Sequence, residues 1–312
     1  MTIIKKRKRF FLRSLKKEMV RNYQLILLAL PAVIIVILFM YVPMYGVQIA
    51  FKDFKSIDGI TGSKWVGFEH FIRFFKSYSF RIIIKNTVFI SFYSLIVGFP
   101  FPIFLALTLN QMKAQSYKRI VQTVTYMPYF ISLVVLSGMI MLVFSPNSGI
   151  IGRLIKLYTN DPSNLLGRPK LFSSIYVWSG VWQYTGWNSI IYLAALSGVD
   201  PELYDASAID GASRWKRIIH IDIPCILPTA TILLILNAGR LMNVGFEKVY
   251  LLQNDLNLPS SEIISTYVYK IGLLNAQYDY SAAINLFNTV INFILLISVN
   301  RLAKKYSDTS LW

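Results

Sequence analysis

The sequence predicts an all-α integral membrane protein with six transmembrane helices and a short helix in one cytoplasmic loop. Of its 312 residues, 55% are hydrophobic and only 15% are charged, whereas about 25% of the residues of a soluble domain are charged. The apolar residues also gather in long blocks. A block of about 18 or more such residues is long enough to cross the hydrocarbon layer as a helix. These observations exclude a soluble globular domain.

Six such blocks follow one another along the chain, and we expect each to be one span: 24–50, 82–109, 120–144, 174–196, 226–242 and 282–299. The first block follows a basic segment, as in a signal peptide, but it is longer than the apolar part of about 7–15 residues that a signal peptide has. We therefore expect it to be retained as a span. The chain then divides into a basic cytoplasmic segment (1–23), a six-span membrane domain (24–303) and a cytoplasmic tail (304–312).

The distribution of basic residues predicts that both ends of the chain are cytoplasmic. The N-terminal segment, the loops at 111–119 and 200–223 and the C-terminal tail together carry 17 of the 32 Lys and Arg residues, and loops rich in Lys and Arg stay inside. The net charge of +17 would suggest a nucleic-acid partner in a soluble protein, but basic residues beside spans bind anionic lipid instead. We therefore expect membrane lipid, and no nucleic acid, around this chain.

The first outer loop departs from this pattern, because it is itself basic. Within it, Phe68, Phe71, Ile72 and Phe75 follow the i, i+3, i+4, i+7 spacing of one helical face. We expect an amphipathic helix here that lies along the outer membrane interface.

The sequence offers few groups with which the chain could drive transport or catalyse a reaction by itself. None of its 15 acidic residues falls inside a predicted span, although ion-coupled carriers usually place an ionisable residue at membrane depth. No G-x-x-x-x-G-K-S/T loop is present to hold ATP. One cysteine and two distant histidines predict that no metal site exists. The energy for any driven transport must therefore come from another chain.

The loop at 200–223 contains the signals for a short helix followed by a turn. Asp200 is a good N-cap and Pro201 suits the first helical position, so we expect a helix to begin there. Gly211 permits the turn that ends it, and a second helical stretch should begin near 213. By its charge alone, this segment would be an ordinary solvated loop.

The spacing of this segment resembles the cytoplasmic coupling loop of ABC-importer permeases, in which E-A-A is followed by D-G-A and then by a hydrophobic residue and L-P. The corresponding residues are Asp205-Ala206-Ser207, Asp210-Gly211-Ala212 and Ile226-Leu227-Pro228. The usual Glu is replaced by Asp205, and the usual second Ala by Ser207. The resemblance implies a type I ABC permease fold with a cytoplasmic coupling helix.

In that family the short helix docks into a cleft on the ATPase subunit, and the resemblance implies the same role here. It implies that Asp205 pairs with a basic residue of the ATPase and that Ala206 and Ala212 keep the contact close. Because Asp205, Ile209 and Ala212 are spaced at i, i+4 and i+7, we expect them to share one helical face. The candidate coupling residues are Asp205, Ala206, Ser207, Ile209, Asp210, Gly211 and Ala212.

Short stretches elsewhere resemble the carbohydrate-uptake branch of these permeases, in particular the group that serves complex or acidic oligosaccharides. They begin at Tyr41 (YVPMYG), Gly67 (GFEHF), Asn86 (NTV), Tyr126 (YMPYF), Gly245 (GFEKVYL) and Asn300 (NRLAKK). The resemblance implies a permease subunit of a binding-protein-dependent importer in a bacterial cytoplasmic membrane. Its implied partners are a second related permease, two ATPase subunits that hold ATP and Mg, and an extracellular solute-binding protein. It also implies that this chain binds no cofactor and catalyses no reaction itself.

Aromatic, amide and basic residues of the fourth and fifth predicted spans are candidates for the path of an oligosaccharide. Aromatic faces stack on sugar rings, and amides bond to hydroxyl groups. We expect this path to be lined by Trp182, Trp187, Asn188, Asn237, Arg240 and Asn243. An Arg240 that faces the path would favour an acidic sugar. The alternatives are that the aromatic residues form an interfacial belt and that Arg240 snorkels outward.

Three other functions stay open from the residues alone. One is an importer of the same type for a peptide or phosphate. Another is an ion-coupled carrier, because backbone carbonyls can also bind sodium. The third is a membrane scaffold that transports nothing. An importer needs an ATPase partner, whereas a carrier or a scaffold does not.

Overall fold

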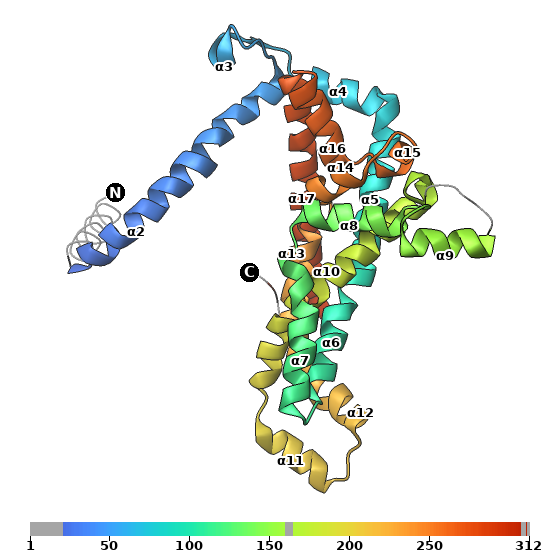
Figure 1. Cartoon of the computed structure of the whole chain (residues 1–312). Coiled ribbons are helices and arrows are strands. Elements are labelled where there is room, and N and C mark those ends of the chain that lie inside the picture. The colour runs from blue at the N-terminus through green and yellow to red at the C-terminus, as the bar shows by residue number, and fades with distance from the viewer. Residues whose placement is uncertain (1–20, 160–164, 307–309, 311–312) are drawn as a thin grey trace. The chain divides into compact units, whose positions relative to one another are not determined.

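The computed structural model describes residues 21–159, 165–306 and 310. The chain forms two compact units, Met1–Val66 and Gly67–Trp312, and Figure 1 shows their elements. Residues 1–20 of the predicted basic segment and residues 307–309 and 311–312 of the predicted tail lie outside the described residues. The predicted limits of these parts therefore stay predictions.

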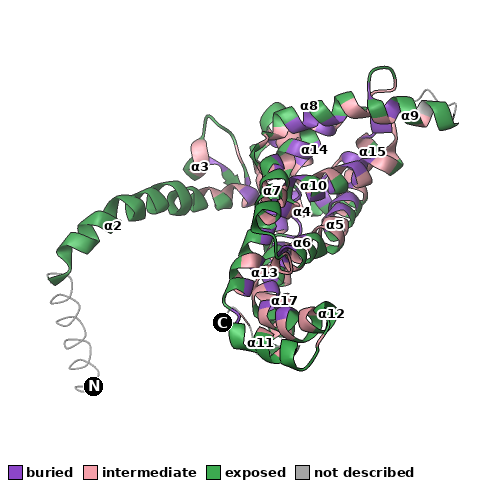
Figure 2. Ribbon diagram, turned by 60° about the horizontal axis from the view of Figure 1, so that its bottom comes forward, coloured by how far each residue is buried: buried purple, intermediate pink, exposed green. Residues whose placement is uncertain are grey.

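The first unit contains one long apolar helix that matches the first predicted span. The helix runs over Tyr23–Phe51 and consists of α2 (Tyr23–Val36), the π-turn η1 (Ile37–Tyr41) and the 3-10 helix η2 (Val42–Phe51). Its most apolar window has a mean hydropathy of 3.1 and no buried residue, and Figure 2 shows α2 exposed along its length. Such a surface suits hydrocarbon rather than water as its surroundings.

A small hairpin after this helix departs from the all-α prediction. Strands β1 (Lys52–Asp53) and β2 (Lys64–Trp65) pair antiparallel, and α3 (Gly59–Gly62) lies between them in the chain. Buried Lys52 donates a hydrogen bond from Nζ to the carbonyl oxygen of Ile60 at 2.5 Å, and its Nζ lies 4.9 Å from the ring centroid of Trp65. Strands of two residues are too short to produce an alternating apolar pattern, so the sequence did not indicate them.

The described residues of the second unit form helices joined by turns and loops, without a strand. Its elements in chain order are α4 (Glu69–Lys76), α5 (Tyr78–Gly98), α6 (Pro100–Asn110), α7 (Gln115–Tyr126), η3 (Met127–Phe130), α8 (Leu133–Phe144), α9 (Ile150–Thr159), η4 (Leu165–Gly167), α10 (Pro169–Ser197), α11 (Pro201–Ile209), α12 (Arg214–Arg217), η5 (Ile218–Asp222), α13 (Ile223–Ala238), α14 (Phe246–Leu252), α15 (Leu258–Ser261), α16 (Ile264–Tyr269), η6 (Lys270–Leu274) and α17 (Tyr278–Tyr306).

Four helices of the described residues are long and apolar enough to cross a membrane, compared with the six spans that the sequence predicts. They are Tyr23–Phe51, Tyr78–Asn110, Arg214–Ala238 and Tyr278–Lys305. A fifth is present if Gln115–Phe130 and Leu133–Phe144, which are bent by 100° at their junction, form one span. The bend occurs where Ile131 is extended and Ser132 caps α8 by accepting the amide of Val135. A proline at position 128 weakens helix continuity just before this point.

The remaining predicted span, 174–196, falls inside α10, which has 29 residues but is not among the apolar candidates. Its sequence mixes apolar residues with Trp, Tyr, Gln and Asn. Buried Gln183 on α10 donates a hydrogen bond to the carbonyl oxygen of Ile131 at 3.2 Å. This bond satisfies a backbone group at the bend between α7 and α8.

The fifth predicted span, 226–242, is displaced toward the N-terminus in the structure. The helix covers Arg214–Ala238, because the π-turn η5 carries it past Pro224 without a break. The candidate helices begin earlier than the predicted spans at 226 and 282, and they include Asp222 and Asp279 near their N-terminal ends. The helix also ends at Ala238, so Asn237 lies in its last turn and Arg240 lies beyond it.

The amphipathic segment of the first outer loop forms α4, but its buried face differs from the expected one. His70 and Phe74 are buried, and Phe74 packs edge-on against Phe80 and Phe287. Of the four residues spaced as one apolar face, Phe68, Ile72 and Phe75 are exposed. His70 and Phe74 are also four residues apart and so share a helical face. Periodicity alone therefore could not show which face of α4 packs against the rest of the protein. The interfacial position of α4 stays a prediction.

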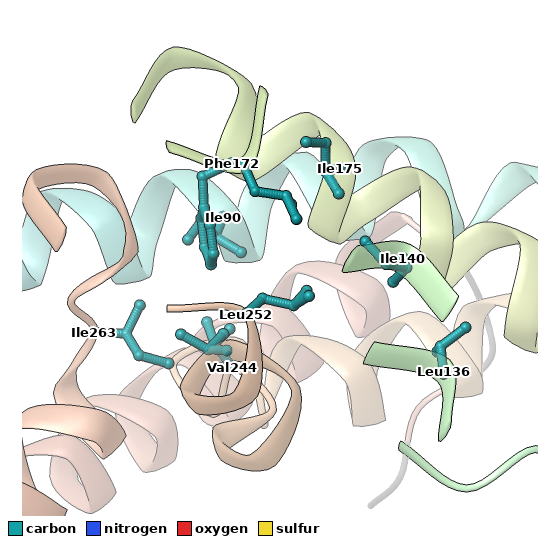
Figure 3. Packing of buried hydrophobic residues seen from close by; sticks show 10 residues of the cluster. Ile90, Leu136, Ile140, Phe172, Ile175, Val244, Leu252 and Ile263 are labelled. Carbon is teal, nitrogen blue, oxygen red and sulfur yellow. The ribbon is translucent and has the colours of Figure 1, made fainter. Parts of the chain in front are cut away.

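The core of the second unit is built around α10. One cluster joins Ile90 of α5, Leu136 of α8, Phe172 of α10 and Leu252 of α14, as Figure 3 shows. Gly186 lets α10 approach α7 closely, because a Cβ there would lie 2.0 Å from the carbonyl oxygen of Thr125. Small residues at helix contacts are typical of membrane bundles.

Candidate functional site

A cavity of about 890 Å³ lies beside α10 in the second unit. It is lined by residues of α5, α6, α8, α10, α13 and α14 and of the segment between α13 and α14. Its volume falls within the range of about 300–1,000 Å³ that is usual for small-molecule sites. This cavity is the candidate site of the second unit.

Five of the six residues predicted to line a substrate path do line this cavity: Trp187, Asn188, Asn237, Arg240 and Asn243. The sixth, Trp182, is not in the lining and is half-exposed. At about 100° per residue, Trp182 lies about 160° around α10 from Tyr184, which does line the cavity. The helix therefore turns Trp182 to its opposite side.

Aromatic rings give the cavity flat apolar surfaces with polar edges. Trp187, Tyr176, Tyr184 and Tyr192 all belong to the lining. The ring of Trp187 is stacked on that of Tyr129 at 4.2 Å between centroids, which holds its orientation. Such amphipathic surfaces suit a ligand that has both apolar faces and hydroxyl groups.

Asn243 is held in place by two asparagines of α17 that the sequence analysis did not single out. Its Oδ1 accepts hydrogen bonds from Nδ2 of Asn288 at 2.9 Å and of Asn292 at 3.0 Å. Asn292 in turn accepts the backbone amide of Met242 at 3.0 Å. Because Asn288 and Asn292 are four residues apart on one helix, their spacing was a signal that could have revealed them.

Two cations, Arg240 and Lys248, line the cavity, and no Asp or Glu is among the described residues of the lining. Lys248 is only 4% exposed. It donates a hydrogen bond to the carbonyl oxygen of Tyr176 at 3.0 Å, and its Nζ lies 4.8 Å from the ring centroid of the same tyrosine. Burial lowers the pKa of Lys248 to about 7. In the sequence this lysine sits in GFEKVYL without a pattern that would indicate its burial.

The loop at 200–223 forms the predicted short helix, α11, at the end of the second unit that also carries α12 (Figures 1 and 2). Asp200 caps it by accepting the amide of Glu202 at 3.0 Å. At its other end Gly211 has a φ of +68°. The amides of Gly211 and Ala212 bond to the carbonyls of Ala208 and Ser207 at 3.1 and 2.9 Å, which is a Schellman motif.

Most of the candidate coupling residues lie on the surface of α11. Asp205, Ala206 and Asp210 are exposed, and Ile209 is 87% exposed although it is a large apolar residue. Ala212 follows the left-handed turn, so it does not continue the helical face of Asp205 and Ile209 as expected. The helix ends at Ile209, because the Schellman turn reverses the chain.

Buried Asp222 connects α11 to the main helices. Its Oδ1 accepts the Tyr204 hydroxyl at 2.5 Å, and its Oδ2 accepts Nε2 of Gln111 at 2.7 Å. Nδ2 of Asn110 lies 3.3 Å from Oδ1 of Asp222 and 3.2 Å from the Tyr204 hydroxyl. Burial and the bond to Asp222 raise the pKa of Tyr204 to about 12. The cluster ties α11, the end of α6 and the helix Arg214–Ala238 together.

The described residues contain no group of three or more His, Cys, Asp or Glu that could hold a metal ion.

Comparison with known proteins places the chain among transport components. Residues 98–308 match the family model described as "Binding-protein-dependent transport system inner membrane component". The polygalacturonan/rhamnogalacturonan transport system permease protein YteP of Bacillus subtilis (strain 168) is 40% identical over 310 residues, which are 99% of this chain and 96% of the relative.

Two solved structures are also similar. One is a bacterial ABC transporter involved in the import of the acidic polysaccharide alginate, with a TM-score of 0.86, 37% identity and coverage of 94% of this chain and 99% of the other. The second is a bacterial alginate ABC transporter in complex with an alginate pentasaccharide-bound periplasmic protein. It has a TM-score of 0.86, 36% identity and coverage of 95% of this chain and 99% of the other.

Proposed function

Because the chain belongs to the family of inner membrane components of binding-protein-dependent transport systems, we propose that it forms one half of the translocation pathway of an ATP-driven importer of acidic oligosaccharides. The main observation in support of an acidic oligosaccharide as the substrate is the composition of the cavity lining. Its lining combines aromatic faces and amides with two cations and, among its described residues, no acidic group. The names of the similar transporters, which concern polygalacturonan and alginate, support the same class.

In this proposal the chain crosses the membrane six times. The spans are the helix Tyr23–Phe51, α5 with α6, the bent pair α7 and α8, α10, the helix Arg214–Ala238 and α17. The 29 residues of α10 extend over about 43 Å at 1.5 Å per residue, which exceeds the hydrocarbon thickness of about 30 Å. Some polar residues of α10 face the cavity rather than lipid, Thr185 and Asn188 among them, and Gln183 is bonded to the Ile131 carbonyl.

The loop at 200–223 acts as the coupling loop, with α11 as the helix that docks on an ATPase subunit. The exposed Ile209 and the small Ala206 allow a close apolar contact, and Asp205 offers a charge for a basic partner residue. Movement of α11 then reaches the spans through the bond between Tyr204 and Asp222. ATP and Mg bind to the ATPase subunits, and this chain performs no catalysis.

The assembly that we propose contains a second related permease, two ATPase subunits and an extracellular solute-binding protein that delivers the oligosaccharide. The similar alginate ABC transporter in complex with an alginate pentasaccharide-bound periplasmic protein supports the solute-binding protein in this assembly. Both termini face the cytoplasm, where basic residues lie beside anionic lipid.

The coupling loop can be tested by co-purification from the native membrane. We expect an ATPase subunit to co-purify with the wild-type chain and to be lost with Asp205→Arg. Asp255→Arg, the same charge reversal at an exposed residue outside the loop, is the matched control and should leave the complex intact. Absence of any ATPase from the wild-type preparation would contradict the proposed importer. An intact and fully active Asp205→Arg complex would contradict the role of α11.

A further inference from the structure

Lys248 is a buried cation without a carboxylate partner. It is 4% exposed, and no ion pair joins it to any acidic residue among those that the structure describes. Its Nζ is recorded with one hydrogen bond, to the carbonyl oxygen of Tyr176, although an ammonium group has three N–H donors. Lysine is almost never fully buried unless it is paired, because removing its charge from water is costly.

Nζ of Lys248 lies beside a glycine of the cavity lining. Lys248 belongs to the cavity lining, as does Gly180 on α10. A Cβ added at Gly180 would lie 3.5 Å from Nζ of Lys248, so a larger side chain at this position would cover the ammonium group. The glycine therefore leaves a space beside Nζ in which a ligand atom can be bound.

Arg240 provides a second cation in the same lining. Its side chain is exposed, and it makes no ion pair or side-chain hydrogen bond with the described residues. The guanidinium group presents a planar fork of donors that matches the two oxygens of a carboxylate. Glu247 precedes Lys248 in α14, but it pairs with neither cation and does not line the cavity.

We propose that Lys248 and Arg240 form a subsite that binds the carboxylate of a uronic acid residue as it passes through the cavity. This inference rests on the proposed function and adds the residues that determine specificity for the charged sugar. The anionic group replaces the carboxylate partner that Lys248 lacks within the chain. Aromatic residues of the same lining, Trp187 and Tyr184, offer surfaces for the apolar face of the sugar ring. A neutral oligosaccharide would leave both cations unpaired, which is unfavourable for the buried one.

The subsite can be tested with the complete importer in proteoliposomes, with its ATPase subunits and binding protein. Uptake of trigalacturonate and of its partially methyl-esterified form is measured alongside ATP hydrolysis. For Lys248→Met we expect uptake of trigalacturonate to fall about tenfold or more relative to the esterified form. Lys248→Arg should retain the preference for the acid, because it keeps the charge.

Two further variants keep the test decisive if Lys248→Met does not assemble. Arg240→Gln alters an exposed side chain without internal partners and should lower the preference for the acid in the same direction. Gly180→Leu keeps both cations but fills the space beside Nζ, so it should also lower the preference for the acid. Lys85→Met, at an exposed lysine outside the cavity lining, is the control and should behave as the wild type does.

The outcomes separate the inference from the proposed function. If the wild-type importer takes up neither form, the proposed function fails. If it takes up the acid but the Lys248, Arg240 and Gly180 variants keep the wild-type ratio of acid to ester, the subsite is wrong and the importer stands. Equal loss of both forms in the variants would also overturn the subsite, because it would show a structural rather than a charge-specific role.

Discussion

The hydroxyl of Tyr204 on α11 donates a hydrogen bond of 2.5 Å to Oδ1 of Asp222, a carboxylate that is fully buried in the helix Arg214–Ala238. The same carboxylate accepts the amide of Gln111 at the end of α6. A short surface helix is thus bonded to a long helix of the bundle through one buried side chain. Hydrogen bonds to charged groups are among the stronger ones in proteins.

Removing this hydroxyl should weaken the coupling between ATP hydrolysis and transport. In Tyr204→Phe, Asp222 keeps its bonds to Gln111 and Asn110 but loses its contact with α11. We expect the amount of substrate imported per ATP to fall about fivefold or more, in the range of usual coupling free energies, while the ATPase still co-purifies. The measurement is uptake and hydrolysis in the same proteoliposomes. Tyr117→Phe, at an exposed tyrosine, should have no effect, and an unchanged ratio in Tyr204→Phe would contradict the connection.

The left-handed turn at Gly211 should stabilise the C-terminal end of α11. Its φ of +68° costs a residue with a Cβ about 1–2 kcal/mol. In Gly211→Ala we therefore expect the backbone amides at the end of α11 to exchange with solvent about tenfold faster, as measured by hydrogen exchange of the purified chain. Asn tolerates the left-handed region, so Gly211→Asn should show a smaller increase. Equal protection in all three forms would show that the motif does not stabilise the helix end.

The contact between α7 and α10 at Gly186 should be sensitive to a single methyl group. A Cβ there would lie 2.0 Å from the carbonyl oxygen of Thr125, so the two helices must move apart. We expect Gly186→Ala to destabilise the chain by about 1–3 kcal/mol and to lower its melting temperature in detergent. Gly138→Ala is the matched control, because a Cβ at Gly138 meets nothing within 4 Å. A melting temperature equal to that of the wild type would contradict the close approach.

The pH dependence of uptake should follow the protonation of Lys248. Burial lowers its pKa from 10.5 to about 7, so the ammonium form is present below that pH and lost above it. We expect the KM for an acidic oligosaccharide to rise as the pH increases from about 6 to about 8, and Lys248→Arg to abolish this rise. A KM that is constant or falls with pH in the wild type would contradict the predicted role.

The lowered pKa of Lys248 also affects the stability of the chain, and stability should increase with pH although substrate binding weakens. Between about pH 7 and the ordinary lysine pKa, the unfolded chain binds a proton that the folded chain does not hold. The contribution of Lys248 to the free energy of unfolding therefore increases with pH over this interval. Thermal melting of the wild type and of Lys248→Met at several pH values measures this difference.

The sequence predicted the features that depend on local signals. Long apolar blocks located the helices Tyr23–Phe51 and Tyr78–Asn110 to within a few residues. Asp200, Pro201 and Gly211 predicted both ends of α11, because capping and left-handed turns have chemical requirements that few residues meet. Five residues predicted for a substrate path also line the cavity, since aromatic and amide residues are rare on helices that face lipid, and the path itself stays a prediction.

Features that depend on contacts between distant segments were not predicted. Asp222 is bonded to Tyr204, 18 residues away, and to Gln111, 111 residues away, so nothing near it in the chain indicates its burial. Lys248 resembles an ordinary charged residue of a short helix until α10 is packed against it. Trp182 lies outside the cavity lining, because helical spacing gives the relative direction of side chains but not which face meets the cavity.

The most direct test of the account is the ATP-driven uptake of an acidic oligosaccharide by the complete importer in proteoliposomes. We predict that labelled trigalacturonate accumulates inside only when ATP, the binding protein and the wild-type chain are all present, and that Asp205→Arg abolishes accumulation. Uptake that persists without ATP, or that collapses with an ion gradient instead, would contradict the claim that this chain is the permease of an ATP-driven importer.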